Sequence, residues 1–203
     1  MTNKKIRFVV AGTGFGDILI LIETILKNSK NHDFLGFIDE DKKKRILKID
    51  KYKVIGNWKL LKKSRLCVFN SVAKNPRLRT KAYLKLKSFG AKFINLIDPN
   101  VNTKFTKLGK GIAIFNDVFL GTNTKIGSQS IIHCFSSIGH DVKIGKNCFI
   151  APGAKILGGT KIGDNVVVGS NSVCLPNTII KSNSVIGAGS TVGGKIPANS
   201  TMF

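Results

Sequence analysis

The apolar positions in the second half of the chain recur every six residues. From Ile114 to Pro197 the sequence divides into fourteen hexads without an insertion. A period of six fits neither an amphipathic helix nor a plain alternating strand. It is typical of a parallel β-helix in which three hexads close one triangular coil. The first residues of the hexads are Ile114, Leu120, Ile126, Ile132, Ile138, Ile144, Ile150, Ile156, Ile162, Val168, Cys174, Ile180, Ile186 and Val192.

The other hexad positions fit the same geometry. Glycine follows the first residue in eight of the fourteen hexads, and it allows positive φ and close backbone stacking at turns. The bulky first residue fills the interior, and a small or β-branched fifth residue lets each corner close. These fifth residues are Val118, Thr124, Ser130, Ser136, Val142, Cys148, Ala154, Thr160, Val166, Ser172, Thr178, Ser184, Ser190 and Ile196.

The first half of the chain has a different pattern. It predicts a buried strand over 5–10, a glycine-rich turn over 11–16, a helix over 17–26 and a second strand over 34–38 that ends in Asp39-Glu40-Asp41. The glycines let a ligand approach the backbone, and the helix amino terminus attracts phosphate. Asp39 could accept hydrogen bonds from a ribose or a base. Because the turn is GxGxG and not GxGxxG, it does not support an NAD enzyme, and a purely structural turn is the alternative.

Two further strands, over 66–69 and 92–94, flank a basic helix over 77–88. The sequence therefore predicts two domains. The first is an α/β, Rossmann-like nucleotide-sugar-binding domain over 1–95, and the second is the β-helix over 96–203.

The composition and charge limit the classes of molecule that the protein is expected to bind. The chain has 203 residues and a formal net charge of +22. Its lysines are scattered and are not interleaved with aromatic residues, which argues against nucleic-acid binding. A basic surface would also attract anionic small molecules such as coenzyme A or nucleotide sugars.

Four cysteines without CxxC spacing indicate a reducing cytosol. The sequence shows no signal peptide, membrane span or metal-ligand motif. We therefore expect a cytoplasmic protein without membrane insertion or a bound metal.

Three stretches carry a resemblance to a known family. They are the glycine-rich turn with Phe37 to Asp41, the link from Phe93 to Pro99, and Ser136 to Gly145. Together with the hexads, they resemble bacterial hexapeptide-repeat sugar acyltransferases with a left-handed β-helix. The narrower likeness is to the group that contains UDP-4-amino-sugar N-acetyltransferases, GDP-perosamine N-acetyltransferases and sialic acid O-acetyltransferases.

The resemblance implies a homotrimer with active sites between subunits and acetyl-CoA as co-substrate. His140 matches the family's catalytic base, Asp141 the acidic residue that follows it, and Gly158 the glycine whose N–H faces the thioester oxygen. The positions implied for coenzyme binding are Phe149, Ser170, Gly187 and Ala188, and Phe149 stands where some relatives have a second histidine. The positions implied for binding the nucleotide sugar are Gly12, Thr13, Gly14, Phe15, Asp39 and Glu40.

The spacing supports this chemistry independently. Gly158 follows His140 by eighteen residues, which is one full coil. It should therefore lie beside His140 at the inter-strand spacing of about 4.8 Å. A base and a backbone donor so placed bracket the point where a thioester carbonyl is attacked. His133 is the rival base, but no carboxylate follows it, and we interpret it as structural or peripheral.

The sequence thus predicts an acetyl-CoA-dependent N-acetyltransferase acting directly on the amino group of a nucleotide-linked amino-deoxysugar. One alternative is O-acetylation of a sialic acid or related nonulosonate. The Asp39-Glu40-Asp41 cluster argues against it, because these carboxylates would repel the carboxylate of such a sugar. A second alternative is a non-catalytic scaffold that binds a nucleotide sugar.

Overall fold

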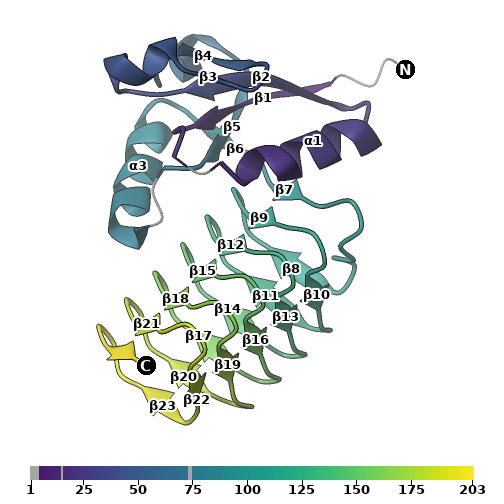
Figure 1. The fold of residues 1–203 in the computed structure, drawn as a ribbon, viewed down its shortest axis with the longest axis vertical. Helices are drawn as coiled ribbons and strands as arrows, with labels where there is room; N and C mark the ends of the chain where they lie inside the picture. Colours follow the sequence, from purple (N-terminus) through teal and green to yellow (C-terminus); the bar gives the residue numbers. More distant parts are fainter. Residues whose placement is uncertain (1–4, 15, 73–74) are drawn as a thin grey trace. The chain divides into compact units, whose positions relative to one another are not determined.

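The computed structural model describes residues 5–14, 16–72 and 75–203, and their contacts divide the chain into two compact units, 1–96 and 97–203. Figure 1 shows the α/β elements of the first unit and the stacked short strands of the second.

The first unit is built on a six-stranded sheet in the order β3-β4-β2-β1-β5-β6. Its pairs are parallel except for β3 with β4, which is antiparallel, so the sheet is mixed. The predicted strand–helix–strand unit is present as β1, α1 and β2, whereas the wholly Rossmann-like character of the domain stays a prediction. The strands are β1 Ile6–Ala11, β2 His32–Ile38, β3 Lys48–Ile49, β4 Tyr52–Gly56, β5 Cys67–Asn70 and β6 Lys92–Phe93.

Helices cover this sheet because their apolar stripes match its buried strands. In β1, residues 8–11 are fully buried, as expected of a strand with parallel neighbours on both sides. Helix α1 buries Ile18, Leu21, Ile22 and Ile25, a spacing that gives one apolar stripe. The helical elements are α1 Ile18–Asn28, the 3₁₀ helix η1 Lys42–Ile46, α2 Leu60–Lys63 and α3 Pro76–Ser88.

The hairpin of β3 and β4 was not predicted. Its two-residue connection is Asp50-Lys51, and Asp50 adopts a positive φ of 53°. Hairpin turns of this length are usually signalled by glycine at the positive-φ position. Because this turn has none, and β3 has only two residues, the sequence pattern did not reveal it.

The second unit is a parallel β-helix with three faces, each a stack of short parallel strands. Up to Val192, each strand of the hexad region pairs with a strand eighteen residues away, for example Ile138 with Ile156 and Ile144 with Ile162. The last coil is two residues shorter, because Ile196 pairs with Ile180. The predicted coil of three hexads is therefore confirmed. Three parallel sheets with hexapeptide repeats fit a left-handed β-helix.

The faces are named here by their order along the coil. The first face consists of β10 Phe119–Leu120, β13 Ser137–Ile138, β16 Lys155–Ile156, β19 Val173–Cys174 and β22 Thr191–Val192. The second face consists of β8 Thr106–Leu108, β11 Thr124–Ile126, β14 Lys143–Ile144, β17 Lys161–Ile162, β20 Ile179–Ile180 and β23 Lys195–Ile196. The third face consists of β7 Leu96–Ile97, β9 Ala113–Ile114, β12 Ile131–Ile132, β15 Phe149–Ile150, β18 Val167–Val168, β21 Val185–Ile186 and β24 Thr201–Met202.

The core of the coil is the column of first hexad residues, which are almost all buried. Polar residues at the fifth position are buried too, except Ser190. Several of them donate to backbone carbonyls at the corners, as Ser136 Oγ does to the carbonyls of His133 and Ala151. The corners turn through residues with positive φ, most of them Asn, Asp or Gly. This regular scaffold fixes where each corner side chain projects.

Candidate functional site

The turns from the first face to the second form the corner that carries His140, here called the His140 corner. Its Nδ1 lies 2.8 Å from Asp141 Oδ2. A carboxylate can only accept, so in the neutral ring Nδ1 carries the proton and Nε2 keeps its lone pair. The imidazole thus has a base nitrogen available for a ligand, while its other nitrogen is held.

Gly158 lies against the imidazole. A Cβ placed on Gly158 would stand 2.6 Å from His140 Nε2 and 2.8 Å from Cε1. Only the absence of a side chain lets the ring occupy this position. Among the described residues the Gly158 N–H has no hydrogen-bond acceptor, so it is available to a ligand. The sequence prediction that these residues meet across one coil is supported by this geometry.

Sequence reasoning missed a third polar group at this corner. Asn123 Nδ2 donates to Asp141 Oδ1 at 2.6 Å, so the carboxylate is held on both oxygens. The hydrogen bonds from His140 and then Asn123 lower the pKa of Asp141 below its usual value, because both stabilise the ionised form. The sequence contains a signal for this contact, because Asn123 precedes Asp141 by eighteen residues, which is one coil. It was overlooked because Asn at a coil corner first indicates a turn residue.

The His140 corner is open in a single chain. The His140 side chain is 70% exposed and that of Asp141 54%. The corner therefore presents both side chains to solvent.

The residues expected to bind coenzyme lie elsewhere on the coil. Ser170, Gly187 and Ala188 belong to the turns from the third face to the first, here called the His133 corner. Ser170 and Ala188 stack one coil apart, and Phe149 projects from β15 of the third face. The chain does not bring these four residues to the His140 corner.

His133 is buried, at 8% exposure, unlike His140. Its ring stacks on Phe115 with centroids 4.3 Å apart and planes 3° apart. Its Nδ1 lies 3.0 Å from the Cys134 backbone nitrogen, which donates to it. The imidazole packs as an aromatic side chain in the wall of the coil, in line with the structural interpretation.

In the first unit, the glycine-rich turn adjoins the end of β2. Thr13 Oγ1 donates to Asp39 Oδ2 at 3.3 Å, and Gly12 turns with a φ of 93° against Val72. A Cβ on Gly14 would meet nothing within 4 Å, so the backbone there is open to a ligand. Phe15 lies outside the described residues. Thr13 and Asp39, both predicted for the nucleotide, are therefore adjacent.

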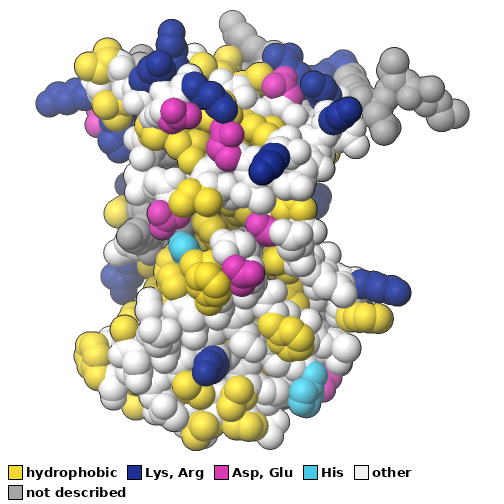
Figure 2. Space-filling view, turned by 45° about the vertical axis from the view of Figure 1, so that its right-hand side comes forward, with side chains coloured by type: hydrophobic (Ala, Val, Ile, Leu, Met, Phe, Trp, Pro, Cys, Tyr) yellow, Lys and Arg dark blue, Asp and Glu magenta, His cyan; other side chains and the backbone are white. Residues whose placement is uncertain are grey.

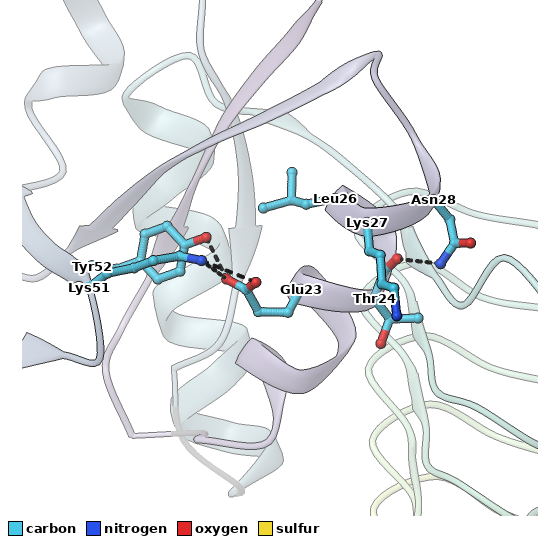
Figure 3. A pocket seen from close by; sticks show the side chains of 7 residues that line it. All are labelled: Glu23, Thr24, Leu26, Lys27, Asn28, Lys51 and Tyr52. Carbon is cyan, nitrogen blue, oxygen red and sulfur yellow. Dashed lines mark hydrogen bonds and ion pairs between the residues drawn. The ribbon is translucent and has the colours of Figure 1, made fainter.

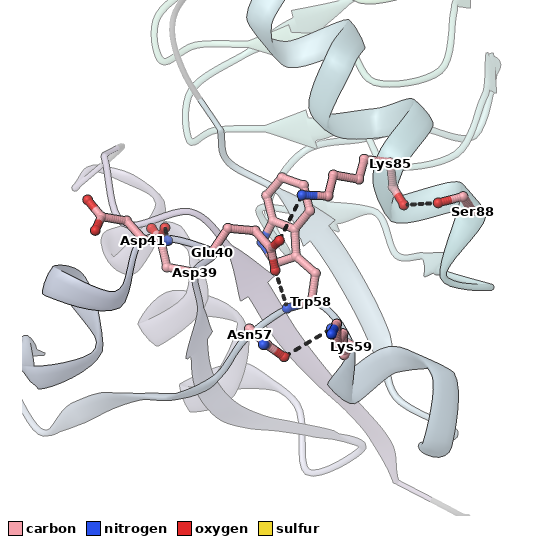
Figure 4. A network of polar contacts seen from close by, with 8 residues as sticks. All are labelled: Asp39, Glu40, Asp41, Asn57, Trp58, Lys59, Lys85 and Ser88. Carbon is pink, nitrogen blue, oxygen red and sulfur yellow. Dashed lines mark hydrogen bonds and ion pairs between the residues drawn. The ribbon is translucent and has the colours of Figure 1, made fainter.

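The two carboxylates after β2 have protein partners. Asp39 is 7% exposed and accepts from the Asp41 backbone N–H at 3.0 Å. Glu40 accepts from the Trp58 backbone N–H at 3.1 Å and pairs with Lys85 at 2.7 Å (Figure 4). The Lys85 ammonium also lies 5.2 Å from the centre of the Trp58 ring. Glu40 thus links the start of α2 to α3, whatever else it contacts.

A cavity of about 650 Å³ in the first unit is lined by none of the predicted residues. It lies between the C-terminal half of α1 and the β3–β4 turn (Figure 3). Glu23 accepts from the Tyr52 hydroxyl at 2.6 Å and pairs with Lys51 at 3.1 Å. These contacts lower the pKa of Glu23 through the hydrogen bond from Tyr52 and then that from Lys51.

The described residues contain no group of three His, Cys, Asp or Glu side chains placed to hold a metal ion. No helix in the described part of the chain is long and apolar enough to cross a bilayer.

The sequence of the coil matches a known family. Residues 123–158 and 159–194 each match the model described as "Bacterial transferase hexapeptide (six repeats)". Both His140 and Gly158 lie within these hexapeptide repeats, as do Asn123 and Asp141. No curated protein sequence matches the chain.

Solved structures share the fold of nearly the whole chain, hexapeptide repeats and first unit alike. One is a His-to-Asn variant of perosamine N-acetyltransferase from Caulobacter crescentus in complex with CoA and GDP-perosamine. It is 23% identical with a TM-score of 0.85, over 96% of this chain and 91% of that one.

Two others come from different bacteria. The acetyltransferase domain of PglB from Neisseria gonorrhoeae, in complex with acetyl coenzyme A, is 20% identical with a TM-score of 0.82 over 95% of this chain and 93% of that one. WeeI from Acinetobacter baumannii is 24% identical with a TM-score of 0.82, over 96% of this chain and 95% of that one. At these identities the likeness establishes the fold.

Proposed function

We propose that this protein is an acetyl-CoA-dependent N-acetyltransferase whose acceptor is the amino group of a nucleotide-linked amino sugar. The observation that carries the proposal is the His140 corner, where an oriented imidazole with an available Nε2 lies against Gly158. Support comes from solved structures of the same fold that contain CoA with GDP-perosamine, or acetyl coenzyme A.

The corner can perform acyl transfer in one direct step. The sugar nitrogen attacks the thioester carbonyl carbon while His140 Nε2 removes a proton from that nitrogen. The Gly158 N–H donates to the carbonyl oxygen as negative charge develops on it. The carbon–sulfur bond then breaks, and the proton passes from the imidazolium to the leaving thiolate. The products are the N-acetyl sugar and CoA.

Asp141 and Asn123 position the base in this scheme. Asp141 holds the imidazole by Nδ1, stabilises its transient positive charge and fixes the tautomer that leaves Nε2 free. Asn123 in turn orients the Asp141 carboxylate. Neither group exchanges a proton with the substrate.

The complete site in this proposal needs a second copy of the chain. The exposed His140 corner lacks an opposite wall, and Ser170 and Ala188 lie on a different corner. A homotrimer would bring the His133 corner of one copy towards the His140 corner of another, so that coenzyme lies between them. Phe149, Gly187 and Ala188 would then contact the coenzyme along this seam.

The nucleotide would bind at the glycine-rich turn of the first unit. Gly14 offers an open backbone, Gly12 and Thr13 precede it in the turn, and Phe15 follows in sequence. Asp39, adjacent to Thr13, would accept from the ribose or base, and Glu40 would support the site through its contacts with Trp58 and Lys85.

The proposal is tested by mixing the protein with acetyl-CoA and an amino-sugar nucleotide and following release of the CoA thiol. We expect turnover with UDP- or GDP-linked 4-amino sugars and none with sialic acid. If only sialic acid is acetylated, the protein is an O-acetyltransferase and the proposed N-acetylation is wrong. Binding of the sugar nucleotide without any binding of acetyl-CoA would favour the scaffold alternative.

His140→Ala tests the role of the base. Turnover should fall by about 10²- to 10⁴-fold, the usual contribution of a general base, with the circular dichroism spectrum unchanged. The ring is 70% exposed, so its removal leaves the core intact. Unchanged turnover would exclude His140 as the base.

A further inference from the structure

The second face of the coil carries a column of lysines. In each strand one residue points outwards, and Lys107, Lys125, Lys143 and Lys161 are direct neighbours in the pairing register. The next outward residue in this stack is Ile179, which pairs with Lys161, and the last is Lys195, which pairs with Ile179. All five lysines are exposed. They are here called the lysine column.

General lysine richness does not explain this column, because the other two faces lack it. The outward column of the first face reads Phe119, Ser137, Lys155, Val173 and Thr191. That of the third face reads Ala113, Ile131, Phe149, Val167, Val185 and Thr201. In the coil part of Figure 2, apolar and uncharged side chains predominate and basic ones are few.

Folding does not favour such an arrangement. Like charges directly opposite each other on neighbouring strands are destabilising, and here they repeat at about 4.8 Å. In the described part of the chain none of the five lysines forms an ion pair with a carboxylate. The column therefore concentrates positive charge on one flat face, and only Lys143 is near enough to a carboxylate, that of Asp141, to act on its pKa.

The lysine column borders the His140 corner. Lys143 follows His140 by three residues, Lys161 follows Gly158 by three, and Lys125 follows Asn123 by two. The strands that carry these lysines begin where the corner ends. Positive charge on low-dielectric protein beside a site raises the local concentration and on-rate of anionic ligands.

We propose that the lysine column attracts the phosphate groups of coenzyme A and steers the thioester to the His140 corner. This inference rests on the proposed function, and it adds a surface outside the residues assigned to coenzyme binding above. The coenzyme carries its charge on phosphates far from the reacting sulfur. The column therefore acts on capture of the donor and leaves the chemical step alone.

The test is a triple variant, Lys125→Gln with Lys143→Gln and Lys161→Gln. At low ionic strength and saturating acceptor, kcat/KM for acetyl-CoA should fall about tenfold, within the range of electrostatic steering, with kcat unchanged. Acetyl-pantetheine, which has no phosphate, should be used equally well by the variant and the wild type. Near 1 M salt, where screening acts over about 3 Å, the difference for acetyl-CoA should vanish.

The matched control removes the same charge from the first unit by Lys48→Gln, Lys81→Gln and Lys87→Gln, all exposed positions. It should leave kcat/KM for acetyl-CoA within about twofold of the wild type. An equal loss in both triple variants, an equal loss with acetyl-pantetheine, or a loss that persists at high salt would overturn the proposal.

Calorimetry separates this inference from the proposed function. The lysine-column variant should lose affinity for CoA and none for pantetheine, whether or not turnover is seen. If the wild type binds CoA in this salt-dependent way but acetylates nothing, the proposed function fails and the inference stands. If the column variant binds CoA normally and instead loses retention on DNA, the surface belongs to a nucleic-acid partner and the inference is wrong.

Discussion

Two histidines on one coil, seven residues apart, have opposite environments. His140 is exposed, is held by a carboxylate and lies against a glycine that leaves room for a ligand. His133 is buried and stacked on Phe115, with Nδ1 turned to the backbone of Cys134. Residue type therefore does not identify the base. The residues around each ring identify the base, because they decide whether a ring nitrogen with a lone pair reaches solvent.

After loss of the base itself in His140→Ala, the largest effect on turnover is expected from Gly158→Ala. The new Cβ would stand 2.6 Å from His140 Nε2, which is too close, so the ring must turn away. Gly158 does not have a positive φ, so alanine fits the backbone and the fold should persist. A displacement of about 1 Å in a catalytic group can cost 10²-fold, and we expect a fall in kcat of that order.

Gly193→Ala is the control for this substitution. It stands two coils further along at the same corner, has no positive φ, and its Cβ would meet only the Leu175 side chain, at 3.1 Å. Its kcat should match the wild type. Full activity of Gly158→Ala would show that the imidazole does not work from its present position.

A smaller loss is expected from Asp141→Asn. The amide can donate to Nδ1, which moves the ring proton to Nε2 and removes the base lone pair. Both side chains are largely exposed, so the ring can partly recover by rotating, and we expect kcat to fall by about tenfold or more. Steady-state kinetics should show an unchanged KM for acetyl-CoA. A loss confined to KM would instead place Asp141 in coenzyme binding.

The smallest effect on turnover is expected at the other histidine. His133→Ala should leave kcat within about twofold of the wild type, because the ring is buried in the wall of the coil and is not placed to accept a proton from the substrate. It should lower the free energy of unfolding by about 1–3 kcal/mol, since a buried stacked ring is lost.

Denaturant unfolding of the His133 variants checks this expectation. His133→Phe restores the stack on Phe115 and should recover most of the lost stability. A collapse of turnover in His133→Phe, with stability retained, would reverse the roles assigned to the two histidines.

The coil and its register followed from the sequence because a period of six leaves little freedom. Once eighteen residues make one coil, the meeting of His140 with Gly158 is a matter of counting. The same counting places Asn123 beside Asp141, but counting does not show where a corner side chain turns. That direction depends on local rotamers and hydrogen bonds, which a periodic pattern does not encode.

The first unit was less predictable, because its contacts join residues far apart without a repeat. The partners of Glu40, at Trp58 and Lys85, follow from the packing of α3 and the β4–α2 turn. Nothing near Glu40 in the sequence indicates them. The hairpin of β3 and β4 was missed for the different reason that its turn lacks glycine.

The most direct test of the account is a crystal structure with an acetyl-CoA analogue in which a methylene group replaces the sulfur. We predict that its ketone oxygen lies about 3 Å from the Gly158 nitrogen, with His140 Nε2 beside the same carbonyl and a second copy of the chain forming the far wall. An analogue bound with its carbonyl remote from this corner, or beside His133 instead, would contradict the account.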